Sequence, residues 1–308
     1  MESPDKTQAQ QWLGLSLLVL PALLWGTVGV SIRWLYGLAD TNALSIGFWR
    51  MGIAAPLLLG SAYWLVGKRF WQVQGSHLWL MLLHGGMMAL YQVCTFAAIG
   101  RVGVAVAILL ALCLAPVVVA ILSSFWLRER LTATVAMAGG LAVLGSALLV
   151  NVPPTSLHLG GEFALGVGLA CAAAFCYAVV VLVSRLLAQH YHPLHTLSIS
   201  FSLSAVILLP FALATQLVVS YSPLGWGVLV YLGVITTVVA YGLFLSGIRY
   251  ATATVASVVT LLEPLMATLL AWLFFAEQLS QKGWIGALLL LLAVVLLYQP
   301  SASQARSS

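Results

Sequence analysis

Ten apolar stretches, each about as long as a membrane span, follow one another through the chain with short polar breaks between them. A helix needs about 20 apolar residues to cross the hydrocarbon core of a bilayer, so ten spans use about 200 residues. The remainder of the 308 residues suffices for loops and tails. The sequence therefore predicts an all-α polytopic membrane protein. We place its ten transmembrane helices at residues 13–32, 43–66, 78–99, 103–125, 132–151, 163–187, 194–218, 224–246, 252–275 and 282–299.

The composition excludes other classes of protein. Hydrophobic residues make up 62% of the chain and charged residues 6%, with a mean hydropathy of +1.08. A soluble domain carries about 25% charged residues to cover its surface. A cytosolic enzyme, a nucleic-acid-binding protein and a disordered chain are therefore excluded. The net charge of +5 comes from basic residues scattered between the apolar stretches, where they act as orientation signals.

The distribution of basic residues predicts the orientation. With the N-terminus in the cytoplasm, eight of the 12 Lys and Arg residues fall in cytoplasmic segments and three in external ones, and Arg50 lies within a span. This excess predicts that both termini, residues 1–12 and 300–308, are cytoplasmic tails. The N-terminal residues lack the basic region of a signal peptide, so we expect an uncleaved first span.

An internal repeat determines the expected architecture. A shift of 148 residues places LAPVVVAILSSFWLRERLT on LEPLMATLLAWLFFAEQLS, which aligns Pro116 with Pro264 and Glu129 with Glu277. Earlier in each half the shift is 153 residues. Each half then holds five spans, and because five is odd, the second copy must cross the bilayer in the opposite sense.

These halves correspond to a first repeat at residues 13–151 and a second at residues 163–299. We predict that the two inverted five-helix repeats surround a central cavity. Inverted repeats with a substrate site near the midplane are a recurring plan of secondary transporters.

Several short motifs carry a resemblance to a known family. They are Trp25-Gly26, Phe48-Trp49-Arg50, Arg128-Glu129-Arg130-Leu131-Thr132 and Leu262-Glu263-Pro264 followed by Ala276-Glu277-Gln278-Leu279-Ser280. The chain resembles ten-span members of the drug/metabolite transporter superfamily built of two EamA domains, and within it the YddG-type amino-acid exporters of the bacterial inner membrane. The resemblance implies efflux of aromatic and other amino acids and related small metabolites.

Glu263 is the sharpest single candidate, because a carboxylate near the middle of a span is costly unless it faces a cavity or a partner. Its repeat mate is Ala115, so the shared fold does not require this charge. It contacts a substrate ammonium, acts as a proton-linked gate, or is a structural carboxylate beside Pro264. Ser257 and Thr260 share its helical face, which suits a cavity wall or close helix packing.

The third span carries a narrow polar stripe. His84, Met88, Tyr91 and Thr95 fall on one helical face and need polar partners, either in a water-filled cavity or on a neighbouring helix. Tyr and Met suit contact with apolar amino-acid side chains. His84 is a proton relay or, more often for a lone His, a packing residue.

Aromatic and basic residues within other spans complete the candidates. Trp25 and Tyr177 occupy corresponding places in the two halves, and Tyr241 lies in the eighth span. Facing aromatic walls suit an amphipathic substrate, whereas the alternative for each residue singly is ordinary helix packing. For Arg50 we favour a structural anchor.

Two pairs of repeat mates are candidates for conformational change. Pro116 and Pro264 can kink their helices and are the candidate hinges. Glu129 and Glu277 each follow a span and precede a new helix, which suggests capping acids with a gating role.

The leading hypothesis is a carrier, not an enzyme, that exports amino acids by alternating access. The sequence has no phosphate-binding GxxxxGK[ST] loop, so energy comes from the substrate gradient or from coupled protons. Proton-linked export of cationic drugs is the alternative, with Glu263 as counter-charge. A nucleotide-sugar exchanger needs several buried basic residues to bind phosphates, whereas only Arg50 lies well inside a span. An intramembrane metalloprotease needs an HExxH motif and an aspartyl protease needs two intramembrane Asp residues, and the spans contain neither. We expect the protein to need no cofactor and to lie in a lipid bilayer. A monomer suffices to form the cavity, because one chain contains both halves.

Overall fold

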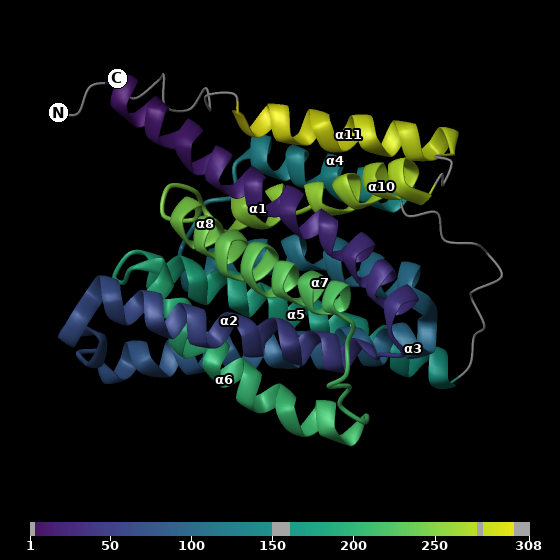
Figure 1. Ribbon diagram of the computed structural model, residues 1–308. Coiled ribbons are helices and arrows are strands. Elements are labelled where there is room, and N and C mark those ends of the chain that lie inside the picture. The colour runs from purple at the N-terminus through teal and green to yellow at the C-terminus, as the bar shows by residue number, and fades with distance from the viewer. Residues whose placement is uncertain (1–3, 150–160, 276–279, 299–308) are drawn as a thin grey trace.

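The computed structural model describes residues 4–149, 161–275 and 280–298, and every regular element in these ranges is helical (Figure 1). Nine of the described segments are long and apolar enough to cross a bilayer, and α4 is a shorter apolar helix. The prediction of a ten-helix membrane protein is confirmed. The elements are α1 (Pro4–Leu38), α2 (Ala43–Val66), the 3₁₀ helix η1 (Gly67–Trp71), α3 (Gly75–Trp126), α4 (Ala133–Leu149), α5 (Gly161–Ala188), α6 (Pro193–Ala214), α7 (Pro223–Gly233), the π-helical turn η3 (Val234–Val239), α8 (Ala240–Gly247), α9 (Ala253–Val259), α10 (Leu262–Phe275) and α11 (Gln281–Tyr298).

Polar residues in the breaks start several of these helices. The Asn42 side chain accepts a hydrogen bond from the Ser45 N–H at the start of α2. Ser222 does the same at α7, where Pro223 takes the first helical position, and Thr252 caps α9. Such caps satisfy amide groups that have no partner within the helix.

The helix α3 contains both the third and the fourth span. Gly103, with a φ of 80°, is the single residue inside it with non-helical backbone angles. Cys94 and Ala111, on opposite sides of Gly103, share one apolar cluster, and Met81 and Leu122 share another. The two parts of α3 therefore run antiparallel as a hairpin. A φ of this sign favours glycine, which has no Cβ to clash.

The seventh span ends earlier than the sequence predicts. The helix α6 ends at Ala214, whereas the apolar pattern continues to residue 218. The Val218 N–H donates to Ser45 Oγ, and Trp49 Nε1 donates to the Val218 carbonyl. Leu217 and Val218 are apolar residues of a non-helical segment that packs along α2, and the helical prediction for residues 215–218 is wrong.

The packing follows the repeat. At one edge of the molecule α4 lies beside α11, and at the other α2 lies beside α6 (Figure 1). Between them, α1 packs against α8 and α10, while α5 packs against the α3 hairpin. The contacts of α1 with α8 and α10 thus correspond to those of its repeat mate α5 with the α3 hairpin. The first helix of each half packs against a hairpin of the other half, so the halves interlock.

Two glycines, one in α1 and one in α5, allow this interlocking. A Cβ on Gly14 of α1 would lie 2.5 Å from the Cβ of Tyr250, and one on Gly166 of α5 would collide with Val102. Tyr250 and Val102 follow the repeat mates Arg249 and Arg101 at the ends of the two hairpins. The same close approach is therefore built at both places.

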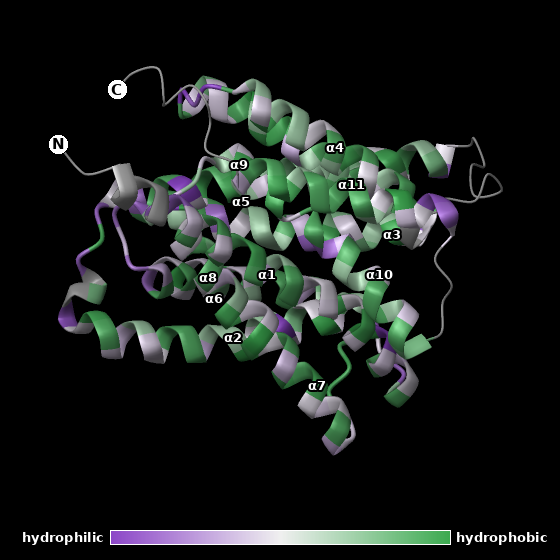
Figure 2. Ribbon diagram, turned by 90° about the horizontal axis from the view of Figure 1, so that it is seen from above, coloured by the Kyte–Doolittle hydropathy of each residue, from purple (hydrophilic) through white to green (hydrophobic). Residues whose placement is uncertain are grey.

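Large apolar side chains also cover the outer faces of the helices. Figure 2 shows green, hydrophobic residues along the helices and purple, hydrophilic residues gathered mainly at their ends. Trp64 is 85% exposed and Phe125 77% exposed. Such side chains contact lipid in a membrane protein.

Candidate functional site

The ninth span is interrupted near its middle. The helix α9 ends at Val259 and α10 begins at Leu262, with turn residues Thr260 and Leu261 between them. Pro264 in the first turn of α10 has no N–H to donate, which favours the break. Thr260 keeps helical backbone angles (φ −63°, ψ −18°), so the interruption is one tight turn rather than an unwound segment.

The carboxylate of Glu263 lies at this interruption. It belongs to the first turn of α10, where the helix dipole favours a negative charge, and its side chain is half-buried. Its electrostatic neighbours come from four other helices. They are Arg50 of α2, Tyr91 of α3, Tyr177 of α5 and Tyr241 of α8.

Arg50 lies in this cluster, although the sequence favoured a structural anchor for it. Its electrostatic neighbours are Tyr241, Tyr91 and Glu263. Its Nε atom is buried, and nothing in the described ranges accepts a hydrogen bond from it or forms an ion pair with its guanidinium. An intramembrane charge without a direct partner is a costly arrangement.

Aromatic rings cover one side of the cluster. Trp25 packs on Tyr241 with ring centroids 4.8 Å apart and on Phe244 at 5.6 Å. Trp25 Nε1 also donates a 3.0 Å hydrogen bond to the carbonyl of Thr236, within the π-helical turn η3. The Tyr241 hydroxyl contacts Met88 Sδ at 3.6 Å. The sequence candidates Trp25, Met88 and Tyr241 are therefore neighbours.

A second aromatic pair joins the two halves. Tyr91 and Tyr177 pack with ring centroids 5.5 Å apart, and Thr260 lies beside the Tyr177 side chain. Tyr91 is half-buried, whereas Tyr177 and Thr260 are buried. The three residues come from α3, α5 and the interruption between α9 and α10.

Other candidates lie in closely packed surroundings. His84 is fully buried, its Nε2 atom lies 3.1 Å from Ser184 Oγ, and its ring stacks on Phe201. Thr95 and Ser257 donate their hydroxyl hydrogen bonds to carbonyls of their own helices. Helical periodicity alone therefore grouped residues whose partners differ.

Gln92 is a polar residue of the third span that the sequence reasoning missed. Its side chain is 4% exposed, and neither its oxygen nor its nitrogen has a partner among the described residues. A Cβ on Gly47 would lie 2.9 Å from Gln92 Oε1, and Gly47 is three residues from Arg50 on α2. Gln92 falls outside the stripe of Tyr91, but an uncharged amide in an apolar span was a usable signal.

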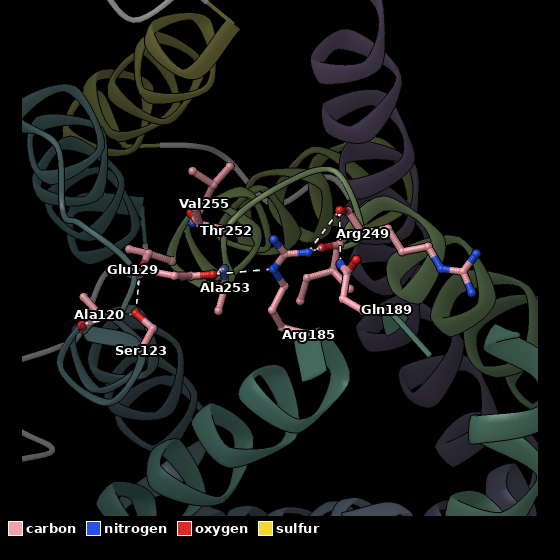
Figure 3. Close-up of polar contacts among 11 residues, drawn as sticks. Ala120, Ser123, Glu129, Arg185, Gln189, Arg249, Thr252, Ala253 and Val255 are labelled. Carbon is pink, nitrogen blue, oxygen red and sulfur yellow. Dashed lines mark hydrogen bonds and ion pairs between the residues drawn. The ribbon is translucent and has the colours of Figure 1, made fainter. Parts of the chain in front are cut away.

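A second polar cluster lies at the end of the molecule where α3, α5 and the α8–α9 connection meet (Figure 3). Arg185 Nε of α5 lies 3.5 Å from Glu129 Oε1, and the two side chains point toward each other. Both carboxylate oxygens of Glu129 accept hydrogen bonds from the Ala253 N–H, at 3.2 and 3.0 Å. Arg185 Nη1 donates to the carbonyls of Ile248 and Arg249.

Glu129 is therefore a capping residue for a helix of the other half. It caps α9, whereas the sequence placed it before α4. Burial raises the pKa of Glu129, and the Ala253 hydrogen bond and Arg185 counteract this shift. Its repeat mate Glu277 lies outside the described residues.

The two candidate hinge prolines differ in their surroundings. Pro116 lies inside the continuous second part of α3, whereas Pro264 follows the interruption of the ninth span. Within the ranges that the structure describes, no group of three or more His, Cys, Asp or Glu side chains could hold a metal ion.

The fold defines a multi-pass helical membrane protein whose interlocking halves enclose oppositely charged side chains. The chain belongs to the EamA-like transporter family, whose pattern matches residues 12–151 and 164–299. It is accordingly a membrane transporter of the drug/metabolite transporter superfamily.

Individual relatives agree with this assignment. The chain is 32% identical to "Uncharacterized transporter YwfM" of Bacillus subtilis (strain 168), over 92% of this chain and 93% of the relative. It is 26% identical to "Pseudopaline exporter CntI" of Pseudomonas aeruginosa (strain UCBPP-PA14), over 92% of this chain and 95% of the relative. A solved crystal structure superimposes with a TM-score of 0.79 at 17% identity, covering 99% of this chain and 100% of the other, which shows the shared fold.

Proposed function

We propose that this transporter exports aromatic and other neutral amino acids, and related small metabolites, across the bacterial inner membrane by alternating access. The observation that carries the proposal is the position of Glu263, at an interruption of the ninth span and surrounded by Tyr91, Tyr177 and Tyr241. The carboxylate suits a substrate ammonium group, and the rings suit an apolar side chain.

Alternating access requires the ends of the molecule to close in turn. The cluster of Glu129, Arg185 and the start of α9 joins three segments at one end. The excess of basic residues assigns this end, with both termini, to the cytoplasm. Glu129 then contributes to a cytoplasmic closure, Pro264 rather than Pro116 is the hinge, and a monomer contains the whole site.

Export of cationic drugs is the second candidate, with Glu263 as the counter-charge. Arg50 argues against it, because a substrate that carries only a positive charge would approach the Arg50 guanidinium as well as Glu263.

Flux in proteoliposomes that contain only this protein tests the proposal. Vesicles are loaded with Phe, Trp, Met or Thr, with and without a pH gradient. Efflux that follows the amino-acid gradient supports a facilitator, and efflux that needs the pH gradient assigns a proton site to Glu263 or His84. The absence of flux for every amino acid, with flux of a cationic drug, overturns the amino-acid proposal in favour of the second candidate.

A further inference from the structure

Two opposite charges lie close together in the spans without pairing directly. Arg50 of α2 and Glu263 of α10 interact electrostatically, yet no ion pair between them occurs in the described ranges. A purely structural pair gains most from direct, hydrogen-bonded contact, because only this repays the desolvation of both ions. The observed arrangement leaves the charged groups of both residues able to contact a third group.

The fold that the two repeats share requires neither charge, because the repeat mates of both residues are uncharged. Under the shift of 153 residues Arg50 aligns with Leu203, and under the shift of 148 residues Glu263 aligns with Ala115. Both repeat mates are therefore apolar residues. The two charges therefore break the internal symmetry at one place, between α2 and α10.

Unpaired polar atoms gather on the Arg50 side of the cluster. Arg50 Nε and both polar atoms of Gln92 are buried without a partner in the part of the chain that the structure describes. Gln92 lies against Gly47, one helical turn from Arg50. A buried polar group without a hydrogen bond is costly, so a bound polar group or water must satisfy these atoms.

Guanidinium and amide donors are suited to a carboxylate, which accepts several charge-assisted hydrogen bonds. We propose that Arg50, assisted by Gln92, binds the α-carboxylate of the substrate while Glu263 binds its α-ammonium group, so that the site selects zwitterions. The inference rests on the function proposed above and assigns a specificity role to Arg50. A zwitterion brings no net charge into the spans and gives both residues a direct partner.

The test uses three compounds that share one ring and differ in charge: phenylalanine, phenethylamine, which lacks the carboxylate, and 3-phenylpropionate, which lacks the amine. Binding is measured as ligand-induced thermal stabilisation of the purified full chain, and transport as competition with phenylalanine flux. Wild type is expected to prefer phenylalanine to both analogues.

Arg50→Gln is expected to raise the dissociation constant for phenylalanine about tenfold or more, the usual effect of losing a hydrogen bond to a charged group. It leaves phenethylamine unchanged, so the preference for phenylalanine over phenethylamine disappears. Glu263→Gln gives the mirror result, with loss of the preference over 3-phenylpropionate. Arg50→Lys retains part of the selectivity, because it keeps the charge but not the planar donor pair.

Two outcomes overturn the inference. Arg50→Gln that binds phenylalanine as wild type does shows that Arg50 does not contact the carboxylate. An equal loss for all three compounds, with Arg50→Lys equally impaired, shows that Arg50 acts on the structure. If the amino-acid proposal itself is wrong, wild type neither binds nor transports phenylalanine, a result visible before any variant is made.

Discussion

Gly26 shows how one absent side chain positions the candidate site. A Cβ at this position of α1 would lie 2.5 Å from the Cβ of Met266 and 2.9 Å from the carbonyl oxygen of Glu263. The backbone of α10 can therefore approach α1 at the turn that carries Glu263. Trp25, the preceding residue, fixes the same part of α1 by its hydrogen bond to Thr236.

Gly26→Ala is expected to lower the free energy of unfolding by about 1–3 kcal/mol, the usual effect of overpacking a close contact, and to reduce transport. Gly29→Ala, on the same helix with nothing within 4 Å of its Cβ, is the matched control. It should be neutral or stabilise by up to about 1 kcal/mol, because Ala favours helices. Thermal unfolding in detergent measures both, and equal effects of the two variants would contradict the close contact.

Glu129 provides a pH-dependent prediction. Burial raises its pKa above the ordinary carboxyl value of about 4.3, so the folded state binds the proton more tightly than the unfolded state. Its contribution to stability is fully present below the unfolded pKa and is lost as pH rises through the raised pKa of the folded state. Glu129→Gln keeps an acceptor for the Ala253 N–H without titrating.

The melting temperature of wild type minus that of Glu129→Gln should therefore fall as pH rises from about 4.3 through the weakly acidic range. Glu129→Ala, which removes the acceptor, should cost about 1 kcal/mol relative to Glu129→Gln, as the loss of a helix cap does. A difference between wild type and Glu129→Gln that grows with pH would show that Arg185 dominates over burial.

At the scale of elements, the interrupted ninth span differs most from its repeat mate. The second part of α3 continues through Pro116, whereas α9 and α10 are separate helices around Thr260 and Leu261. A proline alone does not break a helix here. The sequence predicted equal roles for Pro116 and Pro264, and their surroundings distinguish them.

Pro264→Ala is expected to slow transport several-fold, because it restores a backbone donor at the interruption and lets α9 and α10 join. Pro116→Ala should leave the rate near that of wild type, since its helix is already continuous. Initial rates of phenylalanine flux in proteoliposomes compare the two variants. A normal rate and normal access of labelling reagents in Pro264→Ala would remove Pro264 as a hinge.

At the scale of the whole molecule, the two halves cannot bury their apolar faces separately. The principal partners of α1 are α8 and α10, and that of α5 is the α3 hairpin. The repeat is therefore a sequence unit whose first helix packs against the other unit. Small residues such as Gly145 and Gly286, which approach each other's carbonyl oxygens, join α4 to α11 across the same boundary.

A chain divided between residues 155 and 156 tests this interlocking. Each fragment expressed alone should fail to yield a folded monomer, whereas the co-expressed fragments should copurify as a pair. Size-exclusion chromatography with thermal unfolding measures the result. A single fragment that unfolds cooperatively as a monomer would contradict an interlocked fold.

The sequence by itself determined the spans and the inverted repeat. The spans follow from the length of each apolar stretch, which can be read locally. The inversion follows from the odd number of spans in each half. The sequence also singled out Glu263, Tyr91 and Tyr241 as candidate site residues, because polar and aromatic groups inside a span stand out against their neighbours. It misplaced the end of the seventh span, since lipid and protein neighbours select the same apolar residues.

Only the tertiary structure decided which of these groups meet. Arg50 and Glu263 are 213 positions apart in the chain, and no periodicity within one helix relates them. Glu129 caps α9 rather than the helix that follows it, and His84 packs against Ser184. Such relations depend on how helices cross, and crossing is set by shape and close packing between helices that a pattern along one helix does not contain.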